Sequence, residues 1–176
     1  MWASSSKGLM MVADIAELVA SHPVLEGLPG DTARLVGGCA RNIAVAKGEL
    51  LLAEGEPAET LYLLRRGRVS LEMRCPGQDP LVIDIMGPGT ALGWSWLFPP
   101  YRWRFDARAM DSVGAIAVDA QCFRTKLESD PVFAFEITKR FASILLERLQ
   151  ATGLRLLDLY RATPAEYRDA SAGPNA

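Results

Sequence analysis

The feature that most constrains the fold is a regular series of turn signals between residues 42 and 89. Short apolar runs are interrupted by glycine and proline at intervals of about ten residues, which is the spacing of an all-β barrel or sandwich. The interruptions are Lys47-Gly48, Gly55-Glu56-Pro57, Arg66-Gly67, Pro76-Gly77 and Gly87-Pro88-Gly89. We therefore expect short strands throughout this region.

Residues 60–73, "TLYLLRRGRVSLEM", combine two such runs around a single glycine. The alternation of side chains on both sides of Gly67, and the backbone freedom of glycine itself, predict a β-hairpin with its turn at this residue. Residues 113–120, "VGAIAVDA", predict a closing strand.

Helical spacing of apolar residues frames the strands on both sides. Residues 9–21 predict an amphipathic helix, Asp31 is expected to cap a short helix, and residues 120–130 predict another. A long helix then begins with Pro131 in its first turn. The expected organisation is a lead and helix at 1–21, a strand domain at 22–130, a long helix at 131–162 and a disordered tail at 163–176. The true start of the protein is expected at Met1, Met10 or Met11.

The apolar stripe of the long helix is wider than one small domain needs to cover. A second copy of the same helix would bury the surplus, which predicts a homodimer. The candidate interface residues are Phe141, Leu145, Leu149, Leu156, Leu157 and Tyr160.

Composition excludes several classes of protein. The 19 basic and 21 acidic residues give a net charge of -2, whereas domains that bind nucleic acid usually carry a basic excess. No segment approaches the ~18 apolar residues that a membrane span needs, and no signal peptide is apparent. We expect a cytoplasmic protein that binds neither DNA nor membrane.

The cysteines and the histidine give no sign of a metal or catalytic site. Cys39, Cys75 and Cys122 are odd in number and widely spaced, which argues against a zinc site or a disulfide framework and predicts reduced thiols. His22 is the only histidine, and its position at a helix-to-turn boundary is typical of a cap or surface residue. With no partner for a nucleophile, we expect no enzymatic activity and no catalytic residue.

The order of elements, together with the segments "KGELLLAEGEPAETLYLLRRGRVSL", "MGPG", "ALGWSWL" and "ARA", resembles the cyclic nucleotide-binding domain. That family includes catabolite-activator-type regulators, kinase regulatory subunits and gated channels, and the resemblance covers residues 22–160. It implies a mainly β fold with flanking helices: a double-stranded β-helix, or jelly-roll-like β-roll, followed by a long C-terminal dimerisation helix.

In that family a phosphate-binding cassette lies between the "MGPG" turn and the "ARA" strand, here residues 89–109. A glutamate in it accepts a hydrogen bond from the ribose, and an arginine pairs with the cyclic phosphate. The resemblance places Trp94 at the glutamate position and Trp103 at the arginine position. An indole N–H donates but neither accepts nor neutralises a phosphate, so binding of cyclic AMP in the usual manner is doubtful.

Three interpretations of this aromatic cassette stay open. The indoles fill the former nucleotide cavity, or they form a new pocket for a flat ring such as a nicotinamide nucleotide, or cyclic nucleotide binding persists. Arg102 or Arg104 is expected to face outward, unless a bulge at Pro99-Pro100 turns one of them inward to hold an anion. The candidate pocket residues are Leu92, Gly93, Trp94, Ser95, Trp96, Arg102, Trp103 and Arg104.

Two functions fit these features. The first is a stand-alone dimeric sensor or regulatory module, because the sixteen residues after Tyr160 are too few for a DNA-binding domain. The second is an accessory subunit of a larger redox enzyme, since the chain is similar to small subunits of soluble NAD(P)-dependent hydrogenases. The exposed character expected of "LFPPYRW" suits docking to such a partner, and the ligand would be a cyclic nucleotide or NAD(P)H.

Overall fold

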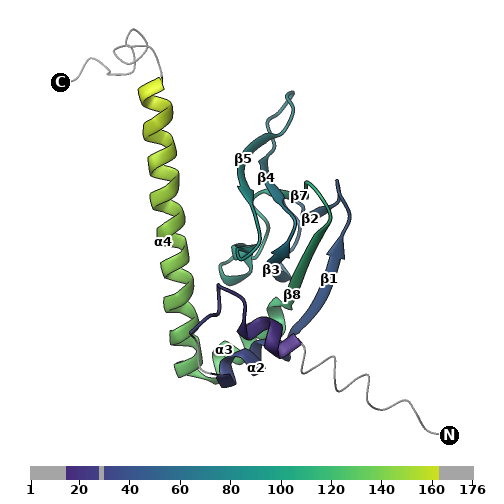
Figure 1. Ribbon diagram of the computed structural model, residues 1–176, viewed down its shortest axis with the longest axis vertical. Helices are drawn as coiled ribbons and strands as arrows, with labels where there is room; N and C mark the ends of the chain where they lie inside the picture. The colour runs from purple at the N-terminus through teal and green to yellow at the C-terminus, as the bar shows by residue number, and fades with distance from the viewer. Residues whose placement is uncertain (1–14, 28–29, 163–176) are drawn as a thin grey trace, which may run out of the picture. The chain divides into compact units, whose positions relative to one another are not determined.

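The computed structural model describes residues 15–27 and 30–162. Within them the strands form two four-stranded antiparallel sheets, in the order β1-β8-β3-β6 and β2-β7-β4-β5 (Figure 1). The strands are β1 (Ala40–Val45), β2 (Leu50–Leu52), β3 (Thr60–Arg66), β4 (Val69–Met73), β5 (Leu81–Met86), β6 (Ala91–Leu92), β7 (Asp106–Ala109) and β8 (Val113–Asp119). This arrangement confirms the predicted β-roll.

The core of the roll is built on β8, which lies between β1 and β3. Every residue of β8 from Val113 to Val118 is buried, so this strand is apolar on both faces. The other sheet contributes Leu52, Val69 and Ala107 to the core. Burial on both faces explains why 113–118 is an unbroken apolar run, whereas the strands nearer the edges alternate.

The predicted hairpin at residues 60–73 is wrong. β3 pairs with β8 and β6, whereas β4 pairs with β5 and β7 in the other sheet. Gly67 lies where the chain crosses between the sheets, with φ +78°, and a Cβ there would stand 2.5 Å from the carbonyl oxygen of Ser112. Glycine is therefore needed here because the chain crosses between the sheets close to a neighbouring turn. Such a crossing has the same sequence signal as a hairpin turn.

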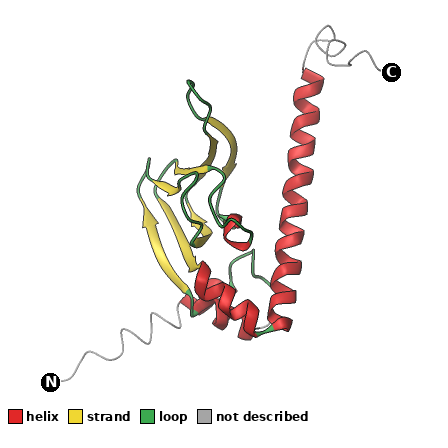
Figure 2. Cartoon of the chain, turned by 180° about the vertical axis from the view of Figure 1, so that it is seen from behind, coloured by secondary structure: helices red, strands yellow, loops and turns green. Residues whose placement is uncertain are grey.

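Helices occupy the two ends of the described sequence (Figure 2). Residues 15–20 are helical, and α2 (Gly30–Gly37), α3 (Ala120–Ser129) and α4 (Pro131–Ala162) follow. The carboxylate of Asp119 accepts a hydrogen bond from Cys122 N and so caps α3, and Asp130 does the same for Phe133 N in α4. Asp31 lies inside the first turn of α2 rather than before it. The predicted lead at 1–8, the predicted helical residues 9–14 and the predicted tail at 163–176 lie outside the described residues.

The chain divides into two compact units, Met1–Glu136 and Ile137–Ala176. Within the described part of the second unit, most of the large apolar side chains of α4 are exposed to solvent. They are Leu145, Leu146, Leu149, Leu154, Leu156, Leu157 and Tyr160. Phe141 differs from the other predicted interface residues because it is buried in the single chain.

The prediction of three reduced thiols is wrong for two of them. Cys39 and Cys122 form a disulfide, and Cys75 is free. The two cysteines are 83 residues apart in sequence, and only the β1–β8 pairing and the start of α3 bring them together. Such a pair gives no local sequence signal.

His22 is also buried rather than a surface residue or a cap. Its Nε2 bonds to the carbonyl oxygen of Leu64 at 3.0 Å, and Val24 N donates to its Nδ1 at 3.3 Å. These contacts hold the segment before α2 against β3. No helix in the described part of the chain is long and apolar enough to cross a membrane.

Candidate functional site

The cassette begins where β6 ends and leads through one short helical turn to β7. Gly93 follows β6 with φ +92° and precedes the 3-10 helix η1 (Trp94–Leu97). An extended loop from Phe98 to Phe105 then returns to β7 at Asp106. The left-handed conformation of Gly93 sets the direction of η1, which is why a residue without a Cβ stands there.

Trp103 closes the cassette over Gly93. A Cβ built on Gly93 would lie 3.0 Å from Cη2 and 3.1 Å from Cζ3 of Trp103, so the indole rests directly on the glycine. Trp103 is 7% exposed. The Trp103 amide donates to Glu56 O and the Trp103 carbonyl accepts from Gly55 N, both at 3.0 Å, so hydrogen bonds fix the backbone of Trp103 at both its amide and its carbonyl.

Trp96 belongs to the core rather than to a ligand pocket. It is fully buried, and its ring centroid lies 5.1 Å from that of Phe123 on α3. Phe123 in turn meets Phe133, in the first turn of α4, edge-on at 5.9 Å. Trp94 and Ser95 are half-buried, and Leu92 is buried. Among the predicted pocket residues, Trp96 and Leu92 are therefore buried, whereas Trp94 and Ser95 are partly accessible to solvent.

Neither arginine beside Trp103 turns inward. Arg102 is exposed, and its Nη1 donates to the carbonyl oxygen of Gly55 at 2.6 Å. Arg104 is exposed as well. The backbone of Arg102 forms an isolated antiparallel bridge with Pro57, and both arginine side chains stay on the surface.

The loop before Trp103 is exposed but fixed. Phe98 is 53% exposed, and Tyr101 is also exposed and adopts φ +55°. Tyr101 N donates to Phe98 O, Ala58 N donates to Tyr101 O at 2.7 Å, and the guanidinium of Arg124 lies 4.9 Å from the centre of the Tyr101 ring. The same Arg124 donates to Trp96 O at 2.8 Å. One side chain of α3 therefore supports both the buried and the exposed aromatic residues of the cassette.

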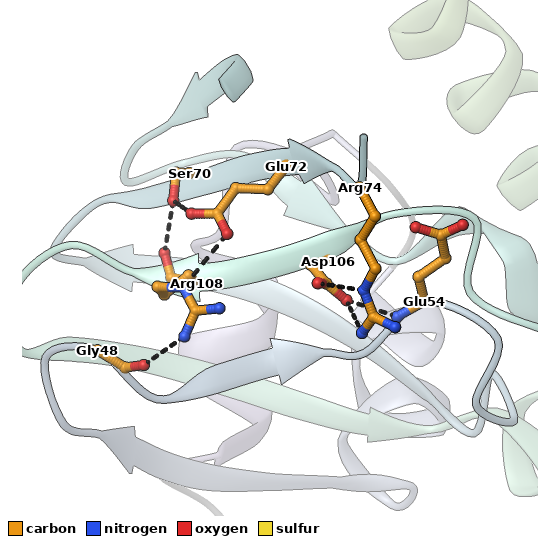
Figure 3. A network of polar contacts seen from close by, with 7 residues as sticks. All are labelled: Gly48, Glu54, Ser70, Glu72, Arg74, Asp106 and Arg108. Atoms are coloured by element: carbon orange, nitrogen blue, oxygen red, sulfur yellow. Dashed lines mark hydrogen bonds and ion pairs between the residues drawn. The ribbon is translucent and has the colours of Figure 1, made fainter. Parts of the chain in front are cut away.

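A buried acid anchors the end of the cassette at β7 (Figure 3). Asp106 is 4% exposed and accepts two hydrogen bonds from Arg74, both at 2.8 Å, and one from Glu54 N at 2.7 Å. The bonds from Arg74 hold the pKa of Asp106 below its ordinary value, although burial opposes them. This arrangement ties the loop at 54–56 to the residues that follow Trp103.

A second ion pair lies beside the first on the same face of the sheet (Figure 3). Arg108 donates to Glu72 at 3.2 Å and to Gly48 O at 3.0 Å, and the Ser70 hydroxyl donates to Glu72 at 2.6 Å. The sequence analysis missed this network. The signal was present, because Ser70, Glu72 and Arg74 alternate with the apolar residues of β4.

Comparisons with known proteins place this geometry in a family. The family pattern described as the cyclic nucleotide-binding domain matches residues 43–130, half of the chain. The CRP-like cAMP-activated global transcriptional regulator of Mycobacterium tuberculosis is 26% identical over 143 residues, which is 81% of this chain. The chain spans 62% of the length of that relative.

Solved structures show the same fold at low identity. A cyclic nucleotide-binding domain from Methylobacillus flagellatus KT gives a TM-score of 0.69 at 18% identity, covering 84% of this chain and 83% of that one. The regulatory subunit of a cAMP-independent protein kinase A from Trypanosoma brucei gives 0.64 at 17% identity, covering 78% and 49%. The chain belongs to the cyclic nucleotide-binding domain family. Among the described residues, no group of acids, histidines and cysteines could hold a metal ion.

Proposed function

We propose that this chain is a non-enzymatic regulatory module in which Trp103 has replaced the cyclic nucleotide's phosphate as the group that closes the cassette. The observation that carries the proposal is the seat of Trp103 on Gly93, at 3.0 Å from the position of a Cβ. On this proposal Trp103 holds the cassette closed without a ligand, and cyclic AMP does not bind in the manner usual for the family.

Charge supports the proposal as much as shape does. A buried phosphate needs a cation, because an uncompensated charge is costly away from water. Arg102 and Arg104 are exposed, and Arg102 already bonds to Gly55 O. The relative from Trypanosoma brucei is itself described as cAMP-independent, so the fold has a precedent for regulation without this ligand.

The test is ligand binding to the purified chain and to a variant that restores the family's polar anchors. Thermal-shift assays with cyclic AMP, cyclic GMP, NADH and NADPH should leave the wild type unchanged, since only a ligand that binds the folded state raises its stability. Trp94→Glu/Trp103→Arg should gain a shift with cyclic AMP. Trp103→Leu, which removes the indole without adding a cation, is the matched control and should show no thermal shift with cyclic AMP. A shift of the wild type with cyclic AMP would contradict the proposal.

We also propose that the module is a homodimer joined through α4. Leu149 is 70% exposed, and Leu145, Leu156 and Tyr160 share its side of the helix at spacings of four, seven and four residues. Seven exposed large apolar side chains between Leu145 and Tyr160 exceed what a monomeric surface usually carries. A second copy of α4 would present the matching stripe, and Phe141 is excluded from that stripe by its burial.

Light scattering coupled to size exclusion tests this association. The wild type should have twice the 19.2 kDa mass of the chain at micromolar concentration. Leu149→Glu/Leu156→Glu should be monomeric with an unchanged circular dichroism spectrum, whereas Glu147→Gln on the exposed surface should remain dimeric. A wild-type mass of 19.2 kDa would refute the dimer.

A second candidate function, docking to a larger redox enzyme, rests on the exposed loop at residues 98–102. Phe98 and Tyr101 are exposed on a backbone that hydrogen bonds already fix, so docking would cost little conformational entropy. Co-purification from the native host should yield subunits of an NAD(P)-dependent hydrogenase with the wild type and not with Phe98→Ser/Tyr101→Ser. Recovery of the same subunits with both chains would exclude this loop as the docking site.

A further inference from the structure

We propose that Cys39 and Cys122 are a redox-active pair whose disulfide controls the mobility of α3 and, through α3, of the aromatic cassette. This inference goes beyond the proposed function, because it requires neither a ligand nor a partner chain. It rests on three observations: how the two cysteines are held together, how a thiol reaches them, and what the residues next to Cys122 contact.

The backbone keeps the two cysteines close independently of the sulfur bond. Cys39 directly precedes β1, and its carbonyl oxygen accepts a hydrogen bond from Asp119 N at 2.8 Å. The carboxylate of Asp119 in turn accepts from Cys122 N at 2.7 Å. After reduction, β1 and β8 remain paired through the register that begins at Ala40 and Val118. The two thiols therefore stay within reach of each other, and the bond can re-form.

The two cysteine residues differ in exposure, which favours attack at one of them over the other. Cys39 is buried, whereas Cys122 is half-buried in the first turn of α3. A low-molecular-weight thiolate such as that of glutathione attacks the Cys122 sulfur, and Cys39 leaves as the thiolate and takes up a proton. A second glutathione then resolves the mixed disulfide. Two glutathione molecules are oxidised to one glutathione disulfide, and the protein gains two thiols.

Charges around Cys39 and Cys122 have opposing effects on the stability of their thiolates. The Nζ atom of Lys126, one helical turn after Cys122, lies 3.9 Å from a Cβ built on Gly38, next to Cys39. A nearby cation and a helix N-terminus both stabilise thiolates. Lys126 therefore favours release of Cys39 in the first step, and the N-terminus of α3 favours release of Cys122 when the mixed disulfide is resolved. The carboxylate of Asp119 opposes them. The site thus has the mixed, partly exposed surroundings in which exchange is feasible.

The residues after Cys122 connect it to the cassette. Phe123 packs on Trp96 with ring centroids 5.1 Å apart, and Arg124 donates to Trp96 O and stacks on the Tyr101 ring. Phe123 also contacts Phe133 at the beginning of α4. The disulfide fixes the first turn of α3 to β1, so opening it allows the supports of Trp96 and Tyr101 to move together.

The test uses the full-length chain equilibrated in glutathione buffers of increasing oxidised fraction. Alkylation with N-ethylmaleimide, read by mass spectrometry, should label only Cys75 in the oxidised form and all three cysteines in the reduced form. The melting temperature should fall by roughly 10 °C on reduction, because the closed loop contains about 80 residues. Hydrogen exchange should accelerate in peptides covering residues 94–104 and 120–133, and remain slow in β8.

Variants separate a switch from a purely structural bond. Cys39→Ser and Cys122→Ser should each show the hydrogen-exchange rates of the reduced wild type in every glutathione buffer. The rates of Cys75→Ser should change with the buffer as those of the wild type do. If the serine variants fail to fold, the reduced and re-oxidised wild type still provides the comparison. The proposal is overturned if no disulfide forms in any glutathione buffer, or if the cassette peptides exchange at the same rate in both redox states.

Discussion

The indole of Trp103 lies against Gly93 so closely that no side chain fits between them: Cη2 stands 3.0 Å from the position that a Cβ would occupy. The same Cβ would stand 3.0 Å from Thr60 O on β3. Gly93 is thus confined between an aromatic ring and a strand, while its own φ of +92° already disfavours any other residue.

Substitution of Gly93 by alanine should therefore destabilise the fold for two reasons, strain and crowding. We expect a loss of about 2–4 kcal/mol in the free energy of unfolding, from the positive φ and from overpacking against Trp103. Gly77→Ala is the matched control: its φ is +73° but nothing lies within 4 Å of the new Cβ, so only about 1–2 kcal/mol should be lost. Urea denaturation measures both, and equal losses would show that Trp103 does not crowd the site.

The aromatic residues Trp94, Trp96 and Phe98 of the cassette should contribute very differently to stability. Trp96 is fully buried on Phe123, so Trp96→Ala should cost about 3–5 kcal/mol. Trp94→Ala, at a half-buried residue, should lower the free energy of unfolding by less than Trp96→Ala does. Phe98→Ala on the exposed loop should lower it by less than about 1 kcal/mol. Trp96→Phe keeps an aromatic ring and serves if the alanine variant does not fold. Equal losses for Trp94 and Trp96 would contradict this ranking.

Local chemistry made the strand region predictable, whereas long-range pairing was not. The glycine- and proline-containing interruptions between residues 42 and 89 lie between strands, so the turn spacing correctly indicates a β-roll. The turn at Gly67 misleads because a crossing between sheets and a hairpin need the same backbone freedom, and only the register of β3 with β8 distinguishes them. The disulfide of Cys39 and Cys122 likewise depends on contacts across 83 residues.

The candidate site shows the same contrast between features that local sequence predicts and features that long-range contacts determine. The spacing within the cassette brings Trp103 and Gly93 together, and the resemblance located both residues in sequence. The sequence predicts Trp96 as a pocket residue, yet the short 3-10 turn, with three residues per turn, directs its side chain toward Phe123. The burial of His22 is not predictable from the sequence, because nothing nearby reveals that its ring forms a hydrogen bond with Leu64 O.

The ion pair of Asp106 and Arg74 should make stability depend on acid pH. Because the pKa of Asp106 in the folded state is below its ordinary value of 3.8, the pair stabilises the fold above that value, and the contribution is lost as pH falls through the folded pKa. Asp106→Asn should lose about 1–2 kcal/mol at neutral pH and show a shallower acid transition. Asp79→Asn, in an exposed turn, should behave like the wild type. Acid titrations followed by circular dichroism would detect the difference, and parallel curves for wild type and Asp106→Asn would exclude the pair as the cause.

His22 should make stability fall at mildly acid pH. Val24 N donates to Nδ1, so the neutral ring must carry its proton on Nε2 and donate it to Leu64 O. Burial lowers the pKa of His22 below 6.5, and the charge of Arg65 acts in the same direction, although the bond to Leu64 opposes both. The unfolded chain therefore takes up a proton first as pH falls, and stability declines below pH 6.5 by at most about 1.4 kcal/mol per pH unit.

Because His22 is the only histidine, its ring protons give an unambiguous NMR titration. The midpoint should lie below 6.5 in the folded protein and return to that value in urea. Urea denaturation of His22→Gln should show a weaker dependence on pH between 7.5 and 5.5 than the wild type, because most carboxylates do not titrate in that interval (about pH 4 in unfolded chains). A folded-state midpoint at or above 6.5 would mean that the ring is not held neutral between Val24 and Leu64.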